Sequence, residues 1–128
     1  MHILRDFVFV GLGSFFGGGL RMVVTRLMTT WCGGAFPIGT FTVNVLGCFL
    51  IGLLSAVAVP GGWLSPQGKL LLTTGFCGGF TTFSTFMQEN GLLLGEHQGM
   101  LALLYVLSSL VIGLLALMAG REIGILLR

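Results

Sequence analysis

The feature that most constrains this chain is the length of its apolar runs. Residues 38–59 read IGTFTVNVLGCFLIGLLSAVAV without a charged side chain, and comparable runs lie on either side. A helix of about 20 apolar residues spans the hydrocarbon core of a bilayer. The chain has 128 residues, of which 55% are hydrophobic and 8% charged, so such runs leave no room for a separate soluble domain.

These runs predict an all-α membrane protein with a single domain over residues 1–128. Four transmembrane helices are expected at about residues 7–24, 38–59, 70–89 and 100–120. The first run resembles a signal peptide, but Arg21 and Arg26 follow it in place of a cleavage site, so we expect a retained span. Arg5 and Asp6 are expected outside this span.

The basic residues give the chain a weak preference for one orientation. With four spans, both termini and the second loop share one side of the membrane. That side carries Arg5, Lys69, Arg121 and Arg128, and the other side carries Arg21 and Arg26. Orientation follows the asymmetry of Lys and Arg, so this bias leaves room for copies inserted both ways. Antiparallel pairing of such copies would supply a partner surface for the helices.

Glycines recur at a spacing that favours close packing of helices. Gly13 and Gly17, and again Gly75 and Gly79, stand four residues apart in apolar runs. This spacing lets helix backbones approach one another closely. Such packing is equally suited to a channel and to a structural membrane subunit.

The third run contains GFCGGFTTFSTF, at residues 75–86, which predicts a broken helix. Two consecutive glycines followed by two β-branched residues make CGGFTT a poor continuous helix. Unpaired backbone groups are costly in hydrocarbon, so a break near the membrane centre requires protein, ion or water to satisfy them. Carbonyl oxygens there suit a hard cation such as Na⁺. The alternative is a continuous helix whose glycines only pack.

Phe83 and Phe86 follow the expected break three residues apart, on one face of a helix. The edge of an aromatic ring is positive and suits an anion path, although plain packing also explains such a pair. The polar side chains near them are Asn44, Thr81, Thr82, Ser84 and Thr85. A strongly hydrated anion needs such donors in place of its water shell. Arg21 either snorkels to the interface or attracts anions in a vestibule.

The absence of certain residue types from the apolar runs argues against several classes of protein. The first, second and fourth runs hold no acidic residue, which disfavours an exporter built on a buried carboxylate. Glu89, near the end of the third run, is the one membrane carboxylate. No Ser, His and Asp set supports an enzyme, and no run of Lys or Arg suggests nucleic acid. Cys32, Cys48 and Cys77 lack the spacing of a metal site or a disulfide framework.

Three motifs resemble one known family: GTFTVN at residues 39–44, TTGFCGGFTTFSTF at residues 73–86, and an arginine late in the first run. With the length and the four-span layout, they resemble the Fluc, or CrcB-type, fluoride channels over essentially the whole chain. The resemblance implies a fluoride-selective passive channel of the bacterial inner membrane, which exports F⁻ that entered the cell as HF. It also implies an antiparallel, dual-topology homodimer in the lipid bilayer, with two pores and a central structural Na⁺.

The resemblance also assigns roles to residues of this sequence. Backbone carbonyls of Gly78 and Thr81 from each subunit would hold the Na⁺, and Phe83 and Phe86 would line the fluoride path with their ring edges. The other positions expected along the path are Asn44, Ser84, Ser109, Arg21, Thr40, Tyr105 and Glu89.

Two positions depart from the commonest pattern of that family. Met87 and Gly113 stand where many members have serine, which removes hydroxyl donors from one end of the path. We expect conduction to survive, because the two phenylalanines, Asn44 and Ser84 are present. Two rival functions stay open: a small dual-topology multidrug exporter, which would need an acid in the first run, and a membrane assembly subunit without transport.

Overall fold

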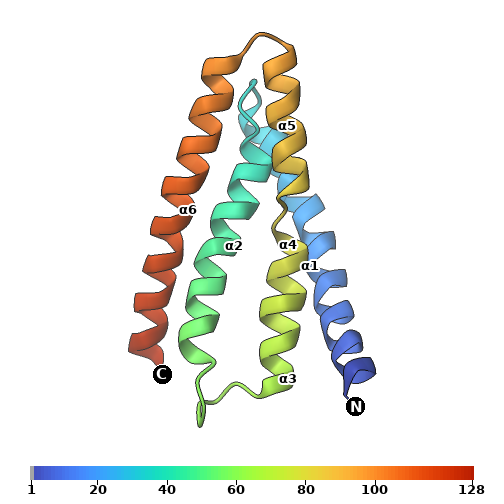
Figure 1. Ribbon diagram of the computed structural model, residues 1–128, viewed down its shortest axis with the longest axis vertical. Helices are drawn as coiled ribbons and strands as arrows, with labels where there is room; N and C mark the ends of the chain where they lie inside the picture. The colour runs from blue at the N-terminus through green and yellow to red at the C-terminus, as the bar shows by residue number, and fades with distance from the viewer. Residues whose placement is uncertain (1) are drawn as a thin grey trace.

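The computed structural model describes residues 2–128, which form helices joined by short connections (Figure 1). In chain order these are α1 (Ile3–Cys32), α2 (Ile38–Val57), α3 (Pro66–Lys69), the π-helical segment η1 (Leu70–Cys77), α4 (Gly78–Phe80), α5 (Ser84–Gly95) and α6 (Gly99–Leu127). α3, η1 and α4 follow one another without a gap and form one rod, residues 66–80. Residues 2–128 contain no strand, so the all-α prediction is confirmed.

Among residues 2–128, three helices are long and apolar enough to cross a membrane: α1, α2 and α6. The remaining apolar run is divided between the rod of residues 66–80 and α5. Both termini and the turn after α2 lie at one end of the molecule (Figure 1). This is the arrangement expected of four passes, whereas the antiparallel homodimer involves a second copy and stays a prediction.

α1 and α6 extend well beyond the spans expected from hydropathy. α1 has 30 residues and includes Arg5 and Asp6, which the sequence analysis placed outside the first span, and α6 has 29 residues. Hydropathy marks the part of a helix that fits the hydrocarbon core, whereas backbone hydrogen bonding continues into the flanking polar residues. α1 ends at Cys32, and the next residue is Gly33, whose φ of 61° favours glycine.

α1 packs against the rod of residues 66–80 through glycines, as their spacing predicts. A Cβ atom at Gly13 would overlap the carbonyl of Leu71, and one at Gly17 would overlap the carbonyl of Phe76. Gly79 of α4 lies in turn against the backbone of α1. The two backbones are therefore in direct contact, with no side chain between them.

A second close contact joins α2 and α6, which run side by side (Figure 1). A Cβ atom at Gly52 would overlap the carbonyl of Leu117, and one at Gly120 would overlap the carbonyl of Phe49. α2 therefore has close neighbours on two sides, α6 on one and α1 with the rod on the other.

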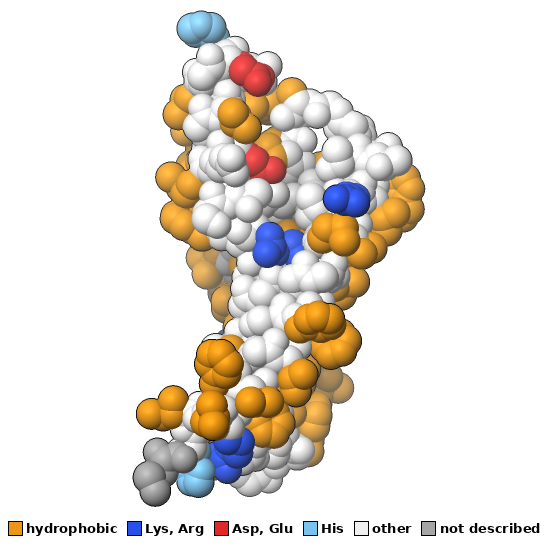
Figure 2. Space-filling view, turned by 90° about the vertical axis from the view of Figure 1, so that its right-hand side faces the viewer, with side chains coloured by type: hydrophobic (Ala, Val, Ile, Leu, Met, Phe, Trp, Pro, Cys, Tyr) orange, Lys and Arg blue, Asp and Glu red, His pale blue; other side chains and the backbone are white. Residues whose placement is uncertain are grey.

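Apolar side chains cover much of the outer surface, as Figure 2 shows for one face. Trp31 in the last turn of α1 and Trp63 in the turn after α2 are 72% and 69% exposed. Tryptophan is enriched where a membrane meets water, so this pair is suited to the two interfaces.

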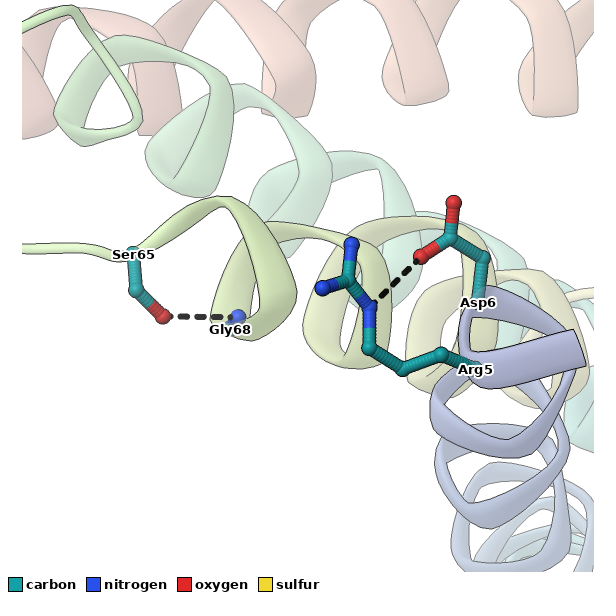
Figure 3. A network of polar contacts seen from close by, with 4 residues as sticks. All are labelled: Arg5, Asp6, Ser65 and Gly68. Carbon is teal, nitrogen blue, oxygen red and sulfur yellow. Dashed lines mark hydrogen bonds and ion pairs between the residues drawn. The ribbon is translucent and has the colours of Figure 1, made fainter. Parts of the chain in front are cut away.

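Polar contacts are found at the end that holds the amino terminus (Figure 3). Arg5 Nε lies 3.5 Å from Asp6 Oδ1, and Ser65 Oγ accepts from the Gly68 amide at 3.0 Å. The Ser65 hydroxyl thus caps the first turn of α3, where Pro66 needs no hydrogen-bond partner for its nitrogen.

Candidate functional site

The helix break lies at residues 81–83, one residue after the paired glycines. α4 ends at Phe80, and Thr81 is extended with φ of −93° and ψ of 161°. The sequence analysis predicted a break with glycine as its cause, but Gly78 and Gly79 both stay helical. Gly79 is small because it packs against α1, so the glycine pair mainly serves helix contact rather than the interruption.

Asn44 of α2 holds the residue at which the helix stops. Its Oδ1 accepts from the Thr82 amide at 2.8 Å, and its Nδ2 donates to the Thr82 carbonyl at 3.0 Å. In a continuous helix the Thr82 amide would donate to the carbonyl four residues earlier, which is that of Gly78. Because Asn44 takes this donor, the Gly78 carbonyl loses its helical partner.

Other carbonyls near the break accept from side chains. Arg21 Nε donates to the Gly79 carbonyl at 2.9 Å. The Cys77 carbonyl accepts from both the amide and the hydroxyl of Thr81, at 3.0 Å and 2.9 Å. From the sequence, Arg21 is expected either at the interface or in a vestibule, and its contact with the break is not predicted.

The start of α5 is supported by Thr82 and Ser84. Thr82 Oγ1 accepts from the Thr85 amide at 3.3 Å and lies 3.5 Å from Ser84 Oγ. A hydroxyl that accepts from a first-turn amide stabilises a helix amino terminus. Thr82 therefore joins the break to α5 through its side chain while Asn44 holds its backbone.

A cavity of about 550 Å³ lies beside the break and brings together most of the predicted site residues. The predicted residues that line it are Asn44, Gly78, Thr81, Phe83, Phe86 and Ser109. They come from α2, α4, the break, α5 and α6, so distant parts of the sequence meet at one place.

The two phenylalanines lie in this cavity with different exposure. Their ring centroids are 6.0 Å apart, with a tilt of 40° between the ring planes. Phe86 is 8% exposed and packs against α6, whereas Phe83 is 74% exposed. Phe83 thus presents a large apolar ring at the outer edge of the cavity.

Ser109 supplies an uncommitted hydroxyl to the same cavity. Its Oγ is buried and has no hydrogen-bond partner among residues 2–128. Cys48 and Cys77 also line the cavity, although the sequence analysis treated them only as small apolar residues. Gly113, one turn beyond Ser109, is buried, and a Cβ atom there would lie 3.4 Å from Cys48 Sγ. A serine at position 113 would therefore fit with a small adjustment.

Three further predicted residues form a hydrogen-bonded cluster around Glu89. Its Oε1 accepts from the Tyr105 hydroxyl at 2.8 Å, and its Oε2 accepts from Thr40 Oγ1 at 3.0 Å. Tyr105 is fully buried, and its ring lies 4.8 Å from that of Phe86 in an edge-on arrangement. The cluster is therefore in contact with the phenylalanine pair.

Glu89 lies in the middle of α5, not near the end of the third segment as the sequence analysis expected. α5 runs to Gly95, because the apolar residues after Glu89 continue the helix. A smaller cavity of about 290 Å³ is lined by Glu89, Thr40 and the connection between α1 and α2. The carboxylate is thus placed beside a polar recess rather than in lipid.

The fold defines a class of protein: a small, all-α, multi-pass membrane protein with a cavity beside its helix break. The chain belongs to the CrcB family, because the family model described as "CrcB-like protein, Camphor Resistance (CrcB)" matches residues 8–121.

Similar proteins match over nearly their whole length. A protein of Chlorobaculum tepidum is 48% identical over 118 residues, which covers 92% of this chain and 93% of that protein. A protein of Chlorobium phaeobacteroides is 42% identical over 120 residues, with 94% and 92% covered. One of Methylobacillus flagellatus is 41% identical over 115 residues, with 89% and 90% covered. Each carries the name "Fluoride-specific ion channel FluC".

Proposed function

We propose that this chain is a fluoride-selective passive channel of the bacterial inner membrane, which exports F⁻ from the cytoplasm and so lowers its toxicity. The observation that carries this proposal is the cavity of about 550 Å³, in which two aromatic rings meet uncommitted polar donors. The names of the similar proteins, which match along almost the whole chain, support the same ion.

The donors in the cavity are suited to a small, strongly hydrated anion. An asparagine amide carries two N–H groups, and the backbone of Thr82 uses one of those of Asn44, which leaves one for an anion. Ser109 Oγ has no hydrogen-bond partner in the described part of the chain and adds a hydroxyl. The ring edges of Phe83 and Phe86 carry partial positive charge, which attracts an anion and repels a cation. Ser84 extends this polar path at the start of α5.

Residues around the cavity complete the proposed route. Arg21 contributes positive charge near the break, which favours the approach of an anion. Thr40, Tyr105 and Glu89 would shape the other end, where each carboxylate oxygen of Glu89 accepts a hydrogen bond from one hydroxyl. Export needs no energy source, because F⁻ that accumulates after HF dissociates in the cytoplasm leaves down its own gradient.

The functional unit in this proposal is an antiparallel, dual-topology homodimer with two pores. The observation that supports this dimer is that one face of the break is exposed. Phe83 is 74% exposed at the edge of the cavity, and Gly78 is exposed with open space where a Cβ atom would stand. A second copy seated on this face would cover the ring and close the cavity. The weak asymmetry of Lys and Arg is compatible with insertion in both orientations.

A structural Na⁺ at the centre of this dimer would be held by the carbonyls of Gly78 and Thr81 from both copies. The donor set fits, because Asn44 diverts the amide that would otherwise bond the Gly78 carbonyl. Oxygen dipoles without a carboxylate are ligands that Na⁺ accepts. When bound, the ion supplies a fixed positive charge where backbone carbonyls of two chains meet.

Fluoride efflux from proteoliposomes made with the purified chain tests the channel. Efflux through this protein should exceed that of empty liposomes, and chloride efflux should stay at background. The absence of serine at positions 87 and 113, where this chain has Met87 and Gly113, should not change this selectivity. The rings of Phe83 and Phe86, the Asn44 amide and the Ser84 hydroxyl are all present. Absence of fluoride efflux would leave an assembly subunit, whereas proton-coupled uptake of organic cations would indicate a multidrug exporter.

A further inference from the structure

Side chains bond to the backbone at two consecutive positions of the break. The last helical bond of α4 runs from the Thr81 amide to the Cys77 carbonyl at 3.0 Å. The next bond of a continuous helix would join the Thr82 amide to the Gly78 carbonyl, but Asn44 occupies that amide. The bond after that would end on the Gly79 carbonyl, which accepts from Arg21 Nε at 2.9 Å. Asn44 therefore removes a donor from the helix, and Arg21 gives the Gly79 carbonyl a hydrogen-bond partner that does not depend on the helix.

We infer that Asn44 is a positioning residue of the cation site, because its Oδ1 holds the Thr82 amide away from the Gly78 carbonyl. This inference rests on the proposed function, in which the carbonyls of Gly78 and Thr81 bind Na⁺. It adds that the carbonyl of Gly78 is available only while Asn44 keeps its bond of 2.8 Å.

The reason is the cost of unpaired groups in an apolar environment. Asn44 and Thr82 are both only partly accessible to solvent. If the Thr82 amide lost its bond to Asn44, bulk water could not fully replace that hydrogen bond. Without Asn44, the Thr82 amide and the Gly78 carbonyl are the natural partners of one another, since they are four residues apart at the end of a helix. The helix would then extend by one bond and withdraw the carbonyl from the cation.

The same side chain connects the two ion sites. Asn44 lines the cavity of about 550 Å³ with Phe83 and Phe86, and its Oδ1 and Nδ2 both hold the Thr82 backbone. Loss of its acceptor atom should disturb the cation site, whereas loss of its donor atom should disturb the anion path. The two effects can be separated by substitution.

The test measures the thermal unfolding midpoint of the purified protein in detergent during a Na⁺ titration, with N-methylglucamine keeping the ionic strength constant. A ligand that binds the folded state raises this midpoint. Asn44→Leu, which removes donor and acceptor, should need at least about tenfold more Na⁺ for the same rise, which equals about 1.4 kcal/mol. Asn44→Asp keeps an oxygen acceptor and adds a negative charge that favours a nearby cation, so it should need no more Na⁺ than the wild type while its fluoride efflux falls.

Ser109→Ala is the matched control, because Ser109 lines the same cavity and makes no bond to the break. It should lower fluoride efflux and leave the Na⁺ dependence unchanged. The inference is overturned if Asn44→Leu keeps the wild-type Na⁺ dependence, or if Asn44→Asp loses it to the same extent as Asn44→Leu. Wild-type protein that conducts fluoride but does not respond to Na⁺ also overturns it and leaves the channel standing. Failure of wild-type efflux is the separate result that rejects the proposed function.

Discussion

Replacement of Gly17 by alanine should separate α1 from the rod of residues 66–80 and weaken the break. The added Cβ would overlap the Phe76 carbonyl and lie 3.0 Å from the Phe80 amide nitrogen. Neither atom can move away by a change of side-chain rotamer, because both are backbone atoms. α1 must therefore move away by about 1 Å to restore ordinary van der Waals separation.

The displacement also reaches the bond between Arg21 and Gly79. Arg21 lies one turn further along α1, and its bond of 2.9 Å to the Gly79 carbonyl would lengthen beyond hydrogen-bonding distance. Overpacking costs about 1–3 kcal/mol, and a lost bond to a charged group about 1.5–3 kcal/mol. Alanine has a higher helix propensity than glycine by about 1 kcal/mol, so we expect a net loss of about 1.5–5 kcal/mol in the free energy of unfolding.

Thermal or denaturant unfolding in detergent measures this loss, and fluoride efflux from proteoliposomes reports the state of the break. Gly19→Ala is the matched control, because Gly19 is in the same helix and a Cβ there meets nothing within 4 Å. That variant should be neutral or slightly more stable than the wild type. Equal stability of the two variants would refute the argument that α1 and the rod touch through their backbones.

Three further predictions concern the cavity and its surroundings. Phe83→Ile combined with Phe86→Ile should leave a folded protein with little fluoride efflux, and normal efflux would place the rings off the path. Tyr105→Phe should lower the free energy of unfolding by about 1–3 kcal/mol, because one oxygen of Glu89 loses the hydroxyl that now lies 2.8 Å away; an unchanged unfolding curve would contradict this. Arg21→Gln should destabilise the protein in the same assay, because the Gly79 carbonyl loses its donor. Arg26→Gln should leave the stability unchanged, because Arg26 is at an exposed position. If both variants lose the same stability, the loss comes from the removed charge and not from the bond of Arg21 to Gly79.

The architecture follows from the sequence because apolar length and helix packing are local properties. Runs of apolar residues predicted the helices, and the pairs at Gly13 and Gly17 and at Gly75 and Gly79 predicted close packing of helices. The structure shows that these pairs bring α1 against the rod. The helix ends were less predictable. α1 continues through Arg5 and Asp6 because backbone hydrogen bonding does not stop where hydropathy falls.

The position of the break could not be read from local sequence. The pair Gly78–Gly79 has low helix propensity, yet both residues stay helical because α1 packs against them. The helix stops where Asn44, which is 38 residues away in the chain, captures the Thr82 amide. Contacts at that separation depend on the tertiary fold. For the same reason, sequence spacing did not reveal the bond of Arg21 to Gly79.

The division of the third segment has a consequence for how the chain enters the membrane during its synthesis. Neither the rod of residues 66–80 nor α5, with 12 residues, is long enough at about 1.5 Å per residue to cross a core of about 30 Å alone. α1 and α2, by contrast, are each long and apolar enough to insert singly. Arg21 and Asn44, the two side chains that satisfy the break, both precede it in the sequence. The helices that carry them emerge from the ribosome first, so the interrupted segment meets its hydrogen-bond partners already in place when it is synthesised.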